Sequence, residues 1–377
     1  MKLCLVCEAL KSCACLVLFG MLPVFLLCAV TVEARTPMRA IYVESGPLDY
    51  NQRVLTGIAR VLHKKGVLLS VPTQAMIDSG TAEEFWRWMG QQSDDRSILF
   101  LQDGFYTAGW DAERRRMVRE AVQKRLETRG DVDVILAFGT WAGIDMAALP
   151  TKVPVVALGV TNAVAAGIVP SVEDSGQDNL VAMVEPMRFK RQVEAFYGIF
   201  PFRRLGVVYE DSPTGRSMVG LDEIEAAAVG LGVEVVRCHT VIHDADADVV
   251  AERISACHRN LVDQHVDAVY LTYNVTMTEA QKRRSLAPLL EKNVPTFSQV
   301  GLADVRQGAL ASSIDTGFAE GHFAAQVLRG LYDGILPRKL SQKFQSPLLF
   351  AINLQTAAHM GWNPSIEVLL SVDTFLE

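Results

Sequence analysis

Short apolar runs that end in small polar turns alternate with helical segments along most of this chain, and this alternation constrains its fold most strongly. In the stretch "VDVILAFGTWAGIDMAALPTKVPVVALGVTN" (residues 132–162), the apolar runs at 134–138 and 154–158 are each followed by a turn that contains glycine. A helical segment separates the two runs. Strand, turn, helix and strand in this order predict a parallel β-sheet with helices on its faces.

The alternation begins near residue 39 and begins again after residues 183–186, which divides the chain into two halves. We expect strands at residues 39–44, 97–102, 134–138, 154–158, 204–210, 233–241, 268–274, 295–299, 308–315 and 348–353, and helices at 52–65, 111–128, 186–200, 216–231, 247–265, 279–292 and 317–332. Residues 103–111 are expected to form a loop. A single open sheet rarely holds so many strands, so two parallel sheets are predicted. The boundary has no low-complexity linker, which indicates a hinge rather than a loose tether.

Residues 1–34 differ from the rest of the chain and are typical of a secretory signal peptide. Lys2 and Lys11 precede the apolar stretch "CACLVLFGMLPVFLLCAV", and Val32-Glu33-Ala34 places small residues where a signal peptidase reads. We predict cleavage after Ala34 and a periplasmic location. A retained single-span anchor is the alternative, because the apolar stretch is close to the length that spans a bilayer. A lipoprotein is a third interpretation, although "FLLC" lacks the small residues of a lipobox.

The charge balance of the chain argues against a nucleic-acid partner. The net charge is −7 at pH 7, and no run of like charge forms a tail. Phosphate binding requires a basic stripe, which this sequence does not provide.

Only two cysteines, Cys238 and Cys257, lie outside the leader, and each is followed by a histidine. Cysteines of an exported protein can form a disulfide, and two Cys-His pairs can bind zinc. Cys238 ends a predicted strand, however, and Cys257 lies on the following predicted helix, so neighbouring side chains diverge. We therefore expect two buried free thiols, with a disulfide as the second interpretation and a metal site as the third.

The sequence contains no catalytic motif that we can identify. G-x-S-x-G, G-x-x-x-x-G-K-[ST] and H-E-x-x-H are all absent. Ser45 follows the first predicted strand, but no base accompanies it, so we do not predict a nucleophile there. The sequence predicts a protein that is not an enzyme and that has no cofactor.

Polar side chains recur at the points where the predicted strands end. They are Glu44, Thr140, Thr161, Asn162, Glu210, Tyr273, Asn274 and Gln299. The carboxyl ends of parallel strands share one edge of a sheet, and ligands bind in the crevice beyond that edge. Turn formation and helix capping favour the same residue types and are the alternative explanation for each one.

Three aromatic residues lie close to these positions. Tyr106 and Trp110 belong to "DGFYTAGWD" (residues 103–111), where they line a pocket or anchor the loop to its lobe. Trp141 follows Thr140 at the expected start of a helix, so it lies near a ligand or packs the helix on the sheet.

The order of several motifs resembles a known family. "VILAFGTWAG", "VPVVALGVTNAVAAGIV", "RRLGVVYEDS", "DAVYLTYN", "VPTFSQ", "GALASSIDTGFAEGHFAAQVLRG" and "FAINLQTAAHMG" follow one another between about residue 39 and the C-terminus. They resemble the TrpX-like substrate-binding proteins of ABC transporters, which have the type 1 periplasmic binding protein fold. Each motif is weak alone, whereas their order and spacing are fairly specific.

The resemblance implies two Rossmann-like lobes with parallel sheets, joined by three crossovers at a hinge. Mapped onto this chain, residues 35–182 and 316–345 form the N-terminal lobe, and residues 183–315 and 346–377 form the C-terminal lobe. Family members with assigned ligands bind amino acids, aromatic ones in some cases. This chain has Asn162 and Gln299 where the family often has Asp, so Glu44, Glu210 or Asp315 would supply the negative charge for an ammonium group.

Together these features predict an exported protein that binds a small solute between two lobes by hinge closure. Its expected partners are a small-molecule ligand and an ABC permease of the inner membrane, and we expect a monomer. The alternative is a periplasmic sensor that signals to a membrane partner.

Overall fold

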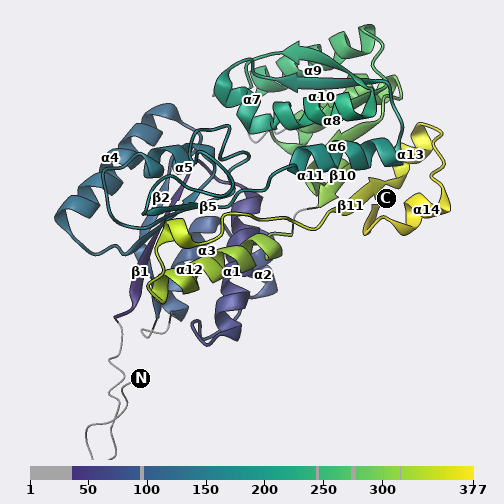
Figure 1. The fold of residues 1–377 in the computed structure, drawn as a ribbon. Coiled ribbons are helices and arrows are strands. Elements are labelled where there is room, and N and C mark those ends of the chain that lie inside the picture. The colour runs from purple at the N-terminus through teal and green to yellow at the C-terminus, as the bar shows by residue number, and fades with distance from the viewer. Residues whose placement is uncertain (1–35, 94–96, 243–245, 273–276, 300, 315) are drawn as a thin grey trace, which may run out of the picture. The chain divides into compact units, whose positions relative to one another are not determined.

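Two separate β-sheets form the framework of the structure, which is a computed structural model that describes residues 36–93, 97–242, 246–272, 277–299, 301–314 and 316–377 (Figure 1). The first sheet has five parallel strands in the order β2-β1-β3-β4-β5. Its strands are β1 (Met38–Glu44), β2 (Ile98–Thr107), β3 (Val134–Phe138), β4 (Val155–Leu158) and β5 (Leu180–Ala182).

The second sheet has seven strands in the order β12-β11-β10-β9-β8-β6-β7. Its strands are β6 (Arg204–Tyr209), β7 (Glu234–His239), β8 (Ala268–Leu271), β9 (Thr296–Ser298), β10 (Ala311–Ile314), β11 (Leu349–Asn353) and β12 (Thr374–Leu376). All neighbours are parallel except β10 and β11. The predicted α/β fold of two lobes, each with a largely parallel sheet, is confirmed.

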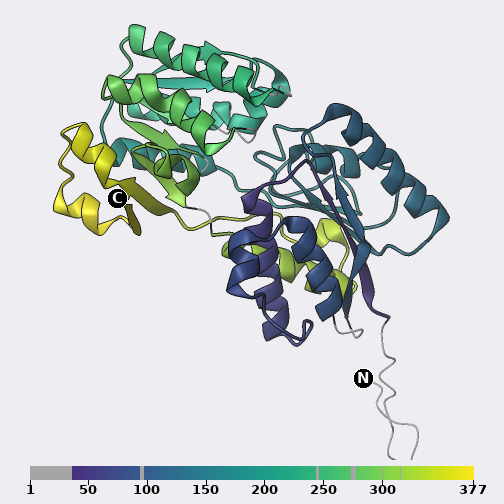
Figure 2. The ribbon, with the colours of Figure 1, turned by 180° about the vertical axis from the view of Figure 1, so that it is seen from behind.

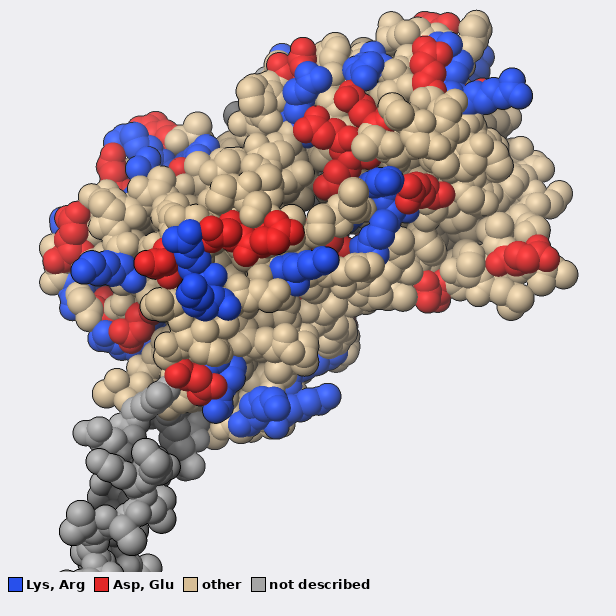
Figure 3. All heavy atoms as spheres, in the orientation of Figure 1, with Lys and Arg blue, Asp and Glu red and all other residues tan. Residues whose placement is uncertain are grey.

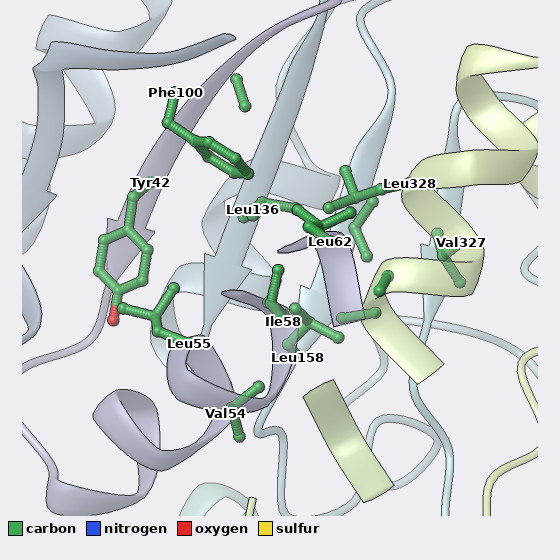
Figure 4. Close-up of a cluster of buried hydrophobic side chains, with 14 of the residues drawn as sticks. Tyr42, Val54, Leu55, Ile58, Leu62, Phe100, Leu136, Leu158, Val327 and Leu328 are labelled. Atoms are coloured by element: carbon green, nitrogen blue, oxygen red, sulfur yellow. The ribbon is translucent and has the colours of Figure 1, made fainter. Parts of the chain in front are cut away.

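Helices cover both faces of the first sheet, because its central strands are buried on both sides. Along β1, Ala40 and Tyr42 point into one apolar cluster, whereas Ile41 and Val43 point into the other. The first cluster is covered by α1 (Asp49–Lys64), α3 (Ala82–Gln92) and α12 (Phe318–Tyr332), and the second by α4 (Ala112–Thr128) and α5 (Thr140–Ala147). Figure 4 shows α1 and α12 side chains meeting Leu136 and Leu158 of the sheet.

The second sheet is covered in the same way. One face packs against α6 (Arg188–Ile199), α8 (Leu221–Leu231) and α13 (Leu354–His359), and the other against α9 (Ala247–Asp263) and α10 (Glu279–Glu291). Shorter helices are α2 (Gln74–Ser79), α7 (Pro213–Val219), α11 (Leu302–Arg306) and α14 (Ile366–Leu370). Seen from behind, the C-terminal residues (yellow) lie beside the green elements of this sheet (Figure 2).

The chain connects the two sheets through three segments. It leaves the first sheet after β5, returns to it with α12, and leaves it again before β11. The second of these segments packs closely on α1 where α12 begins. A Cβ atom on Gly57 of α1 would lie only 2.6 Å from the carbonyl oxygen of Gly317. The first and third connections run side by side, since Val184 and Lys343 form a parallel bridge.

Two predicted elements differ from the structure. Residues 103–107 are not a loop but the end of β2, whose register against β1 shifts between Ala40 and Tyr42. The single helix expected at 216–231 is two helices, α7 and α8, which meet at Gly220 with φ of 66°. A Cβ atom there would lie 2.0 Å from the Phe189 ring, so the break lets α6 pack closely.

The expectation of two free thiols is wrong. Cys238 of β7 and Cys257 of α9 form a disulfide with a Cα–Cα distance of 5.6 Å. Side chains of consecutive residues do point in different directions on a strand and on a helix. This separates each histidine from its neighbouring cysteine, but it does not prevent the two cysteines from facing each other.

Within the described ranges, no helix combines the length and the apolar character that a bilayer span requires.

Candidate functional site

The strand order of the first sheet reverses between β1 and β3, so the carboxyl ends of these strands form the edge where doubly wound sheets bind ligands. Ser45, directly after β1, bridges the two strands at this edge: its hydroxyl donates to the carbonyl of Phe138 at 3.3 Å and accepts from the N–H of Ala142 at 3.1 Å. Ser45 is buried, and a Cβ atom on Gly139 would lie 2.6 Å from its hydroxyl. Gly139, with φ of 88°, therefore turns the chain tightly from β3 into α5.

The first turn of α5 presents backbone donors at this edge of the sheet. Ser45 binds the N–H of Ala142, and the N–H of Gly143 bonds to the Gly139 carbonyl at 2.9 Å. Within the described residues, the N–H groups of Thr140 and Trp141 form no hydrogen bond. A helix N-terminus carries partial positive charge, so this turn favours an anionic group such as a carboxylate.

Glu44 lies at the same edge, but its carboxylate accepts hydrogen bonds from other residues of the protein. Its carboxylate accepts from the Tyr42 hydroxyl at 2.7 Å and from the Asn51 amide at 2.9 Å, and its side chain is buried. Burial and the Glu44 charge raise the pKa of Tyr42 well above its usual value, which keeps the hydroxyl protonated as a donor. Glu44 therefore anchors α1 to β1 in this conformation.

Thr161 and Asn162 follow β4 and are half-buried. The Asn162 side-chain oxygen accepts from the N–H of Ala165 at 2.9 Å, so it stabilises the turn that follows the strand. Its amide nitrogen is the group that would donate to a ligand.

Trp110 and Trp141 pack against each other beside this edge. The Trp110 ring packs on Gly46, where an added Cβ would lie 2.5 Å away, and its N–H donates to the Pro47 carbonyl at 3.2 Å. Trp110 meets Trp141 edge to face at 6.0 Å, and the Arg115 guanidinium lies 5.1 Å from the centre of the Trp141 ring. Trp110 thus anchors the loop after β1.

Tyr106 has a different role. Its hydroxyl accepts a hydrogen bond from Arg125 at 3.2 Å, and the same guanidinium binds Asp103 and Asp131. Tyr106 therefore belongs to the ionic cluster that fastens α4 to the end of β2.

Sequence reasoning missed Tyr50, which lies beneath this edge. A Cβ atom on Gly159 would lie 2.8 Å from the Tyr50 ring and 3.8 Å from the Gly139 backbone nitrogen. The ring thus fills the space between the ends of β3 and β4. The one available signal was its place in the turn "SGPLDYN" after the first strand.

In the second lobe, the strand order reverses between β6 and β8. A hydroxyl again bridges the two strands, because Thr272 donates to the carbonyl of Val208. The direction is the opposite of that in the first lobe: Ser45 follows the first strand of its lobe and reaches β3, whereas Thr272 follows β8 and reaches β6, the first strand of the second lobe. Both lie at edges where doubly wound sheets bind ligands.

The other predicted residues of this edge make protein contacts. Glu210 is half-buried, and its carboxylate accepts from the N–H of Ile242 at 3.3 Å. Gln299 is buried and donates to the Val219 carbonyl at 2.8 Å. Tyr273, Asn274 and Asp315 lie outside the described residues.

A polar cavity that sequence reasoning missed lies where the connections meet the second sheet. Its polar lining residues are Arg188, Gln192, Ser313, Thr316, Glu320 and Ser346. Gln192 donates to Ser313 at 2.6 Å and accepts from the buried Tyr270 hydroxyl. Glu320 and Ser313 were part of the motif "GALASSIDTGFAEGHF", but spacing alone did not place them at the connections.

Electrostatics and metal chemistry do not single out another site. On the face shown in Figure 3, basic and acidic side chains are interspersed rather than gathered by sign. Among the residues that the structure covers, no cluster of three or more His, Cys, Asp or Glu side chains is arranged to hold a metal ion.

Comparison with solved structures reveals the same fold. A conserved domain protein from Vibrio cholerae is 17% identical, with 90% of this chain and 99% of that chain covered and a TM-score of 0.66. The ABC domain from Streptococcus pneumoniae in complex with L-Trp is 18% identical, with 90% and 100% covered and a TM-score of 0.64. A ligand-free, open substrate binding protein with adhesive properties from Clostridium difficile is 18% identical, with 90% and 99% covered and a TM-score of 0.56. A search of curated proteins found no match.

The family comparison is more specific. Residues 112–374, more than half of the chain, match the model of the ABC transporter substrate binding protein family. Members of this family bind a small-molecule substrate outside the cytoplasm for a permease. The chain therefore belongs to the ABC transporter substrate binding proteins.

Proposed function

We propose that this chain is the exported solute-binding component of an ABC transporter and that it closes on a small polar solute by movement at its hinge. Contacts from both lobes would favour the closed state, since a ligand shifts a conformational equilibrium only through differential affinity. Residues 35–182 with 316–345 would move against residues 183–315 with 346–377. We infer that the leader is cleaved after Ala34 and that the protein acts as a periplasmic monomer.

The observation that carries the proposal is the first turn of α5. Two N–H groups remain available beside the buried Thr140 hydroxyl, and the Trp141 ring stands next to them. This combination suits a carboxylate attached to a compact organic group, such as an amino acid or a related acid. Thr161, Asn162 and the polar residues that line the cavity beside the connections would provide further contacts.

Thr140→Ala is expected to weaken solute binding by about five- to a hundredfold, since loss of a buried polar partner costs about 1–3 kcal/mol. Titration calorimetry measures the affinity, with L-tryptophan as the first probe together with any solute that is recovered with the protein. Asn162→Ala should weaken binding similarly, and it should also cost about 1 kcal/mol of stability because Asn162 caps a turn.

Thr128→Ala is the matched control. Thr128 is exposed at the end of α4, and its hydroxyl donates to the carbonyl of Lys124 within α4. Unchanged affinity in Thr140→Ala, together with a clear loss of stability, would mean that Thr140 has only a structural role.

A further inference from the structure

A buried carboxylate joins the first and third connections to α6. One oxygen of Glu185 accepts from the Arg191 guanidinium at 2.5 Å, from the Ser346 N–H at 2.8 Å and from the Ser346 hydroxyl at 2.5 Å. The Glu185 side chain is 6% exposed. Glu185 lies between β5 and α6, Arg191 lies on α6, and Ser346 lies just before β11, so three segments meet at one oxygen. We call Glu185, Arg191 and Ser346 the hinge triad.

The hinge triad is closed by a further contact. Both terminal nitrogens of Arg191 donate to the Ser346 carbonyl at 3.2 Å. A short stretch of backbone ladder lies next to it, because the N–H of Val184 bonds to the Gln342 carbonyl at 2.8 Å and the N–H of Phe344 bonds to Val184 at 2.9 Å. Charge-assisted hydrogen bonds of this kind are roughly twice as strong as neutral ones, so the triad is the stronger of these two ties.

The same cluster holds two buried atoms without hydrogen bonds. They are the second carboxylate oxygen of Glu185 and the Nε atom of Arg191. Native proteins rarely leave buried polar atoms unpaired, and an exception calls for a physical explanation. The Arg188 Nε atom lies 3.9 Å from this Glu185 oxygen, which is close enough for an ion pair but beyond hydrogen-bond range, so a small rotation would bring the two atoms into hydrogen-bond contact.

The backbone beside the triad is also unusual. Met187 has φ of 65°, in the left-handed region that residues other than glycine rarely adopt. Such conformations persist where the surrounding structure enforces them, and they collect at switch regions. The strained residue lies within the first connection, two residues from Glu185.

We propose that the hinge triad is a latch with two alternative pairings. In the conformation described here, Glu185 is bound through one oxygen to Arg191 and Ser346. A rotation about the connections tightens the ion pair of Arg188 with the second oxygen into a hydrogen bond, which satisfies the atom that now lacks one and relaxes Met187. Glu185 is therefore the positioning residue that sets how readily the two lobes change their relative orientation.

The latch has a consequence for affinity that rests on the proposed solute-binding function. Apparent affinity falls by the fraction of protein in the binding-competent state, so a change in the hinge equilibrium changes affinity without a change in solute contacts. The latch itself can be tested without any solute, and its failure is therefore distinguishable from failure of the proposed function.

The test compares Glu185→Gln and Glu185→Ala with the wild-type protein, all free of solute. Hydrogen exchange measured by mass spectrometry should show at least tenfold faster exchange at residues 184–192 and 344–350 in both variants, because a charge-assisted tie is lost. Small-angle scattering should show a wider distribution of radii, which a residue with only a local structural role would not change. Glu194→Gln is the control, because Glu194 lies on the same helix in an exposed pair with Lys190 at 3.7 Å.

The two measurements decide the proposal together. Faster exchange confined to the connections, with a wider distribution of radii, supports the latch. Unchanged exchange, or a uniform increase across both sheets, would overturn it. Faster local exchange with unchanged scattering would also overturn it, because the triad would then be a tether without influence on lobe orientation.

Discussion

Reduction of the Cys238–Cys257 disulfide is expected to lower the free energy of unfolding of the second lobe by about 3 kcal/mol. The bond closes a loop with a sequence separation of 19, and the chain-entropy model gives about this value for a loop of that size. It ties β7, at the edge of the second sheet, to α9, which packs on one face of that sheet. Urea unfolding with and without a thiol reductant measures the loss.

The double variant Cys238→Ser with Cys257→Ser is the control for this experiment. It should unfold at the midpoint of the reduced protein and show no further response to reductant. A wild-type midpoint that does not move with reductant would contradict the prediction. The first lobe, which has no cysteine among its described residues, should unfold with an unchanged midpoint.

Acid is expected to destabilise the second lobe through His258. This side chain is buried on α9, and its Nδ1 atom contacts the Ser285 carbonyl at 2.6 Å, which assigns the ring proton to Nδ1. Burial lowers the pKa of His258 to about 4, although the neighbouring Asp304 acts in the opposite direction. Asp304 is itself paired with Lys282 at 2.9 Å, which limits its effect on the ring.

The sign follows from proton binding in the two states. An unfolded histidine has a pKa of about 6.5, so between pH 6.5 and 4 the unfolded chain binds a proton that the folded chain does not. Stability is therefore fully present above pH 6.5 and falls as the pH is lowered to about 4, by about 3 kcal/mol in total.

Chemical unfolding at several pH values measures this slope. His258→Gln should flatten the slope in this window, even though the variant is less stable at pH 7. His322→Gln, on the exposed side of α12, should keep the wild-type slope. A wild-type slope in His258→Gln would show that other groups carry the acid sensitivity.

The alternation of strands and helices was readable from the sequence because both sheets are buried on two faces. Such strands appear as continuous apolar runs, as in residues 134–138, and their ends appear as small polar turns. The strand β11 was also predicted, but its antiparallel direction could not be read from the sequence. The short edge strands β5 and β12, of three residues each, were not predicted. The extension of β2 through Asp103 was missed because a polar strand end looks like a loop.

Whether the candidate residues bind a solute stays a prediction, and their contacts could not be predicted from the sequence, for a physical reason. Residue type and position place Glu44, Thr140, Asn162 and Gln299 at sheet edges, but they do not reveal which partner each side chain already has. Glu44 is bound by Tyr42 and Asn51, and Gln299 by Val219, through contacts between segments far apart in sequence. The hinge triad could not be predicted from the sequence for the same reason, because Glu185 and Ser346 are separated by 161 residues.

The proposed function requires that this protein bind and release a solute without altering it. Native mass spectrometry of the freshly purified protein from the extracytoplasmic fraction tests this claim most directly. We expect a chain that begins at Arg35 and carries one small acid, which is released unchanged on denaturation and compacts the protein in scattering when it is added back. A chain that retains its leader, or that is recovered only from membranes, would contradict export as a free periplasmic protein. A solute that is chemically altered on incubation, or that binds without compaction, would contradict the proposed function itself.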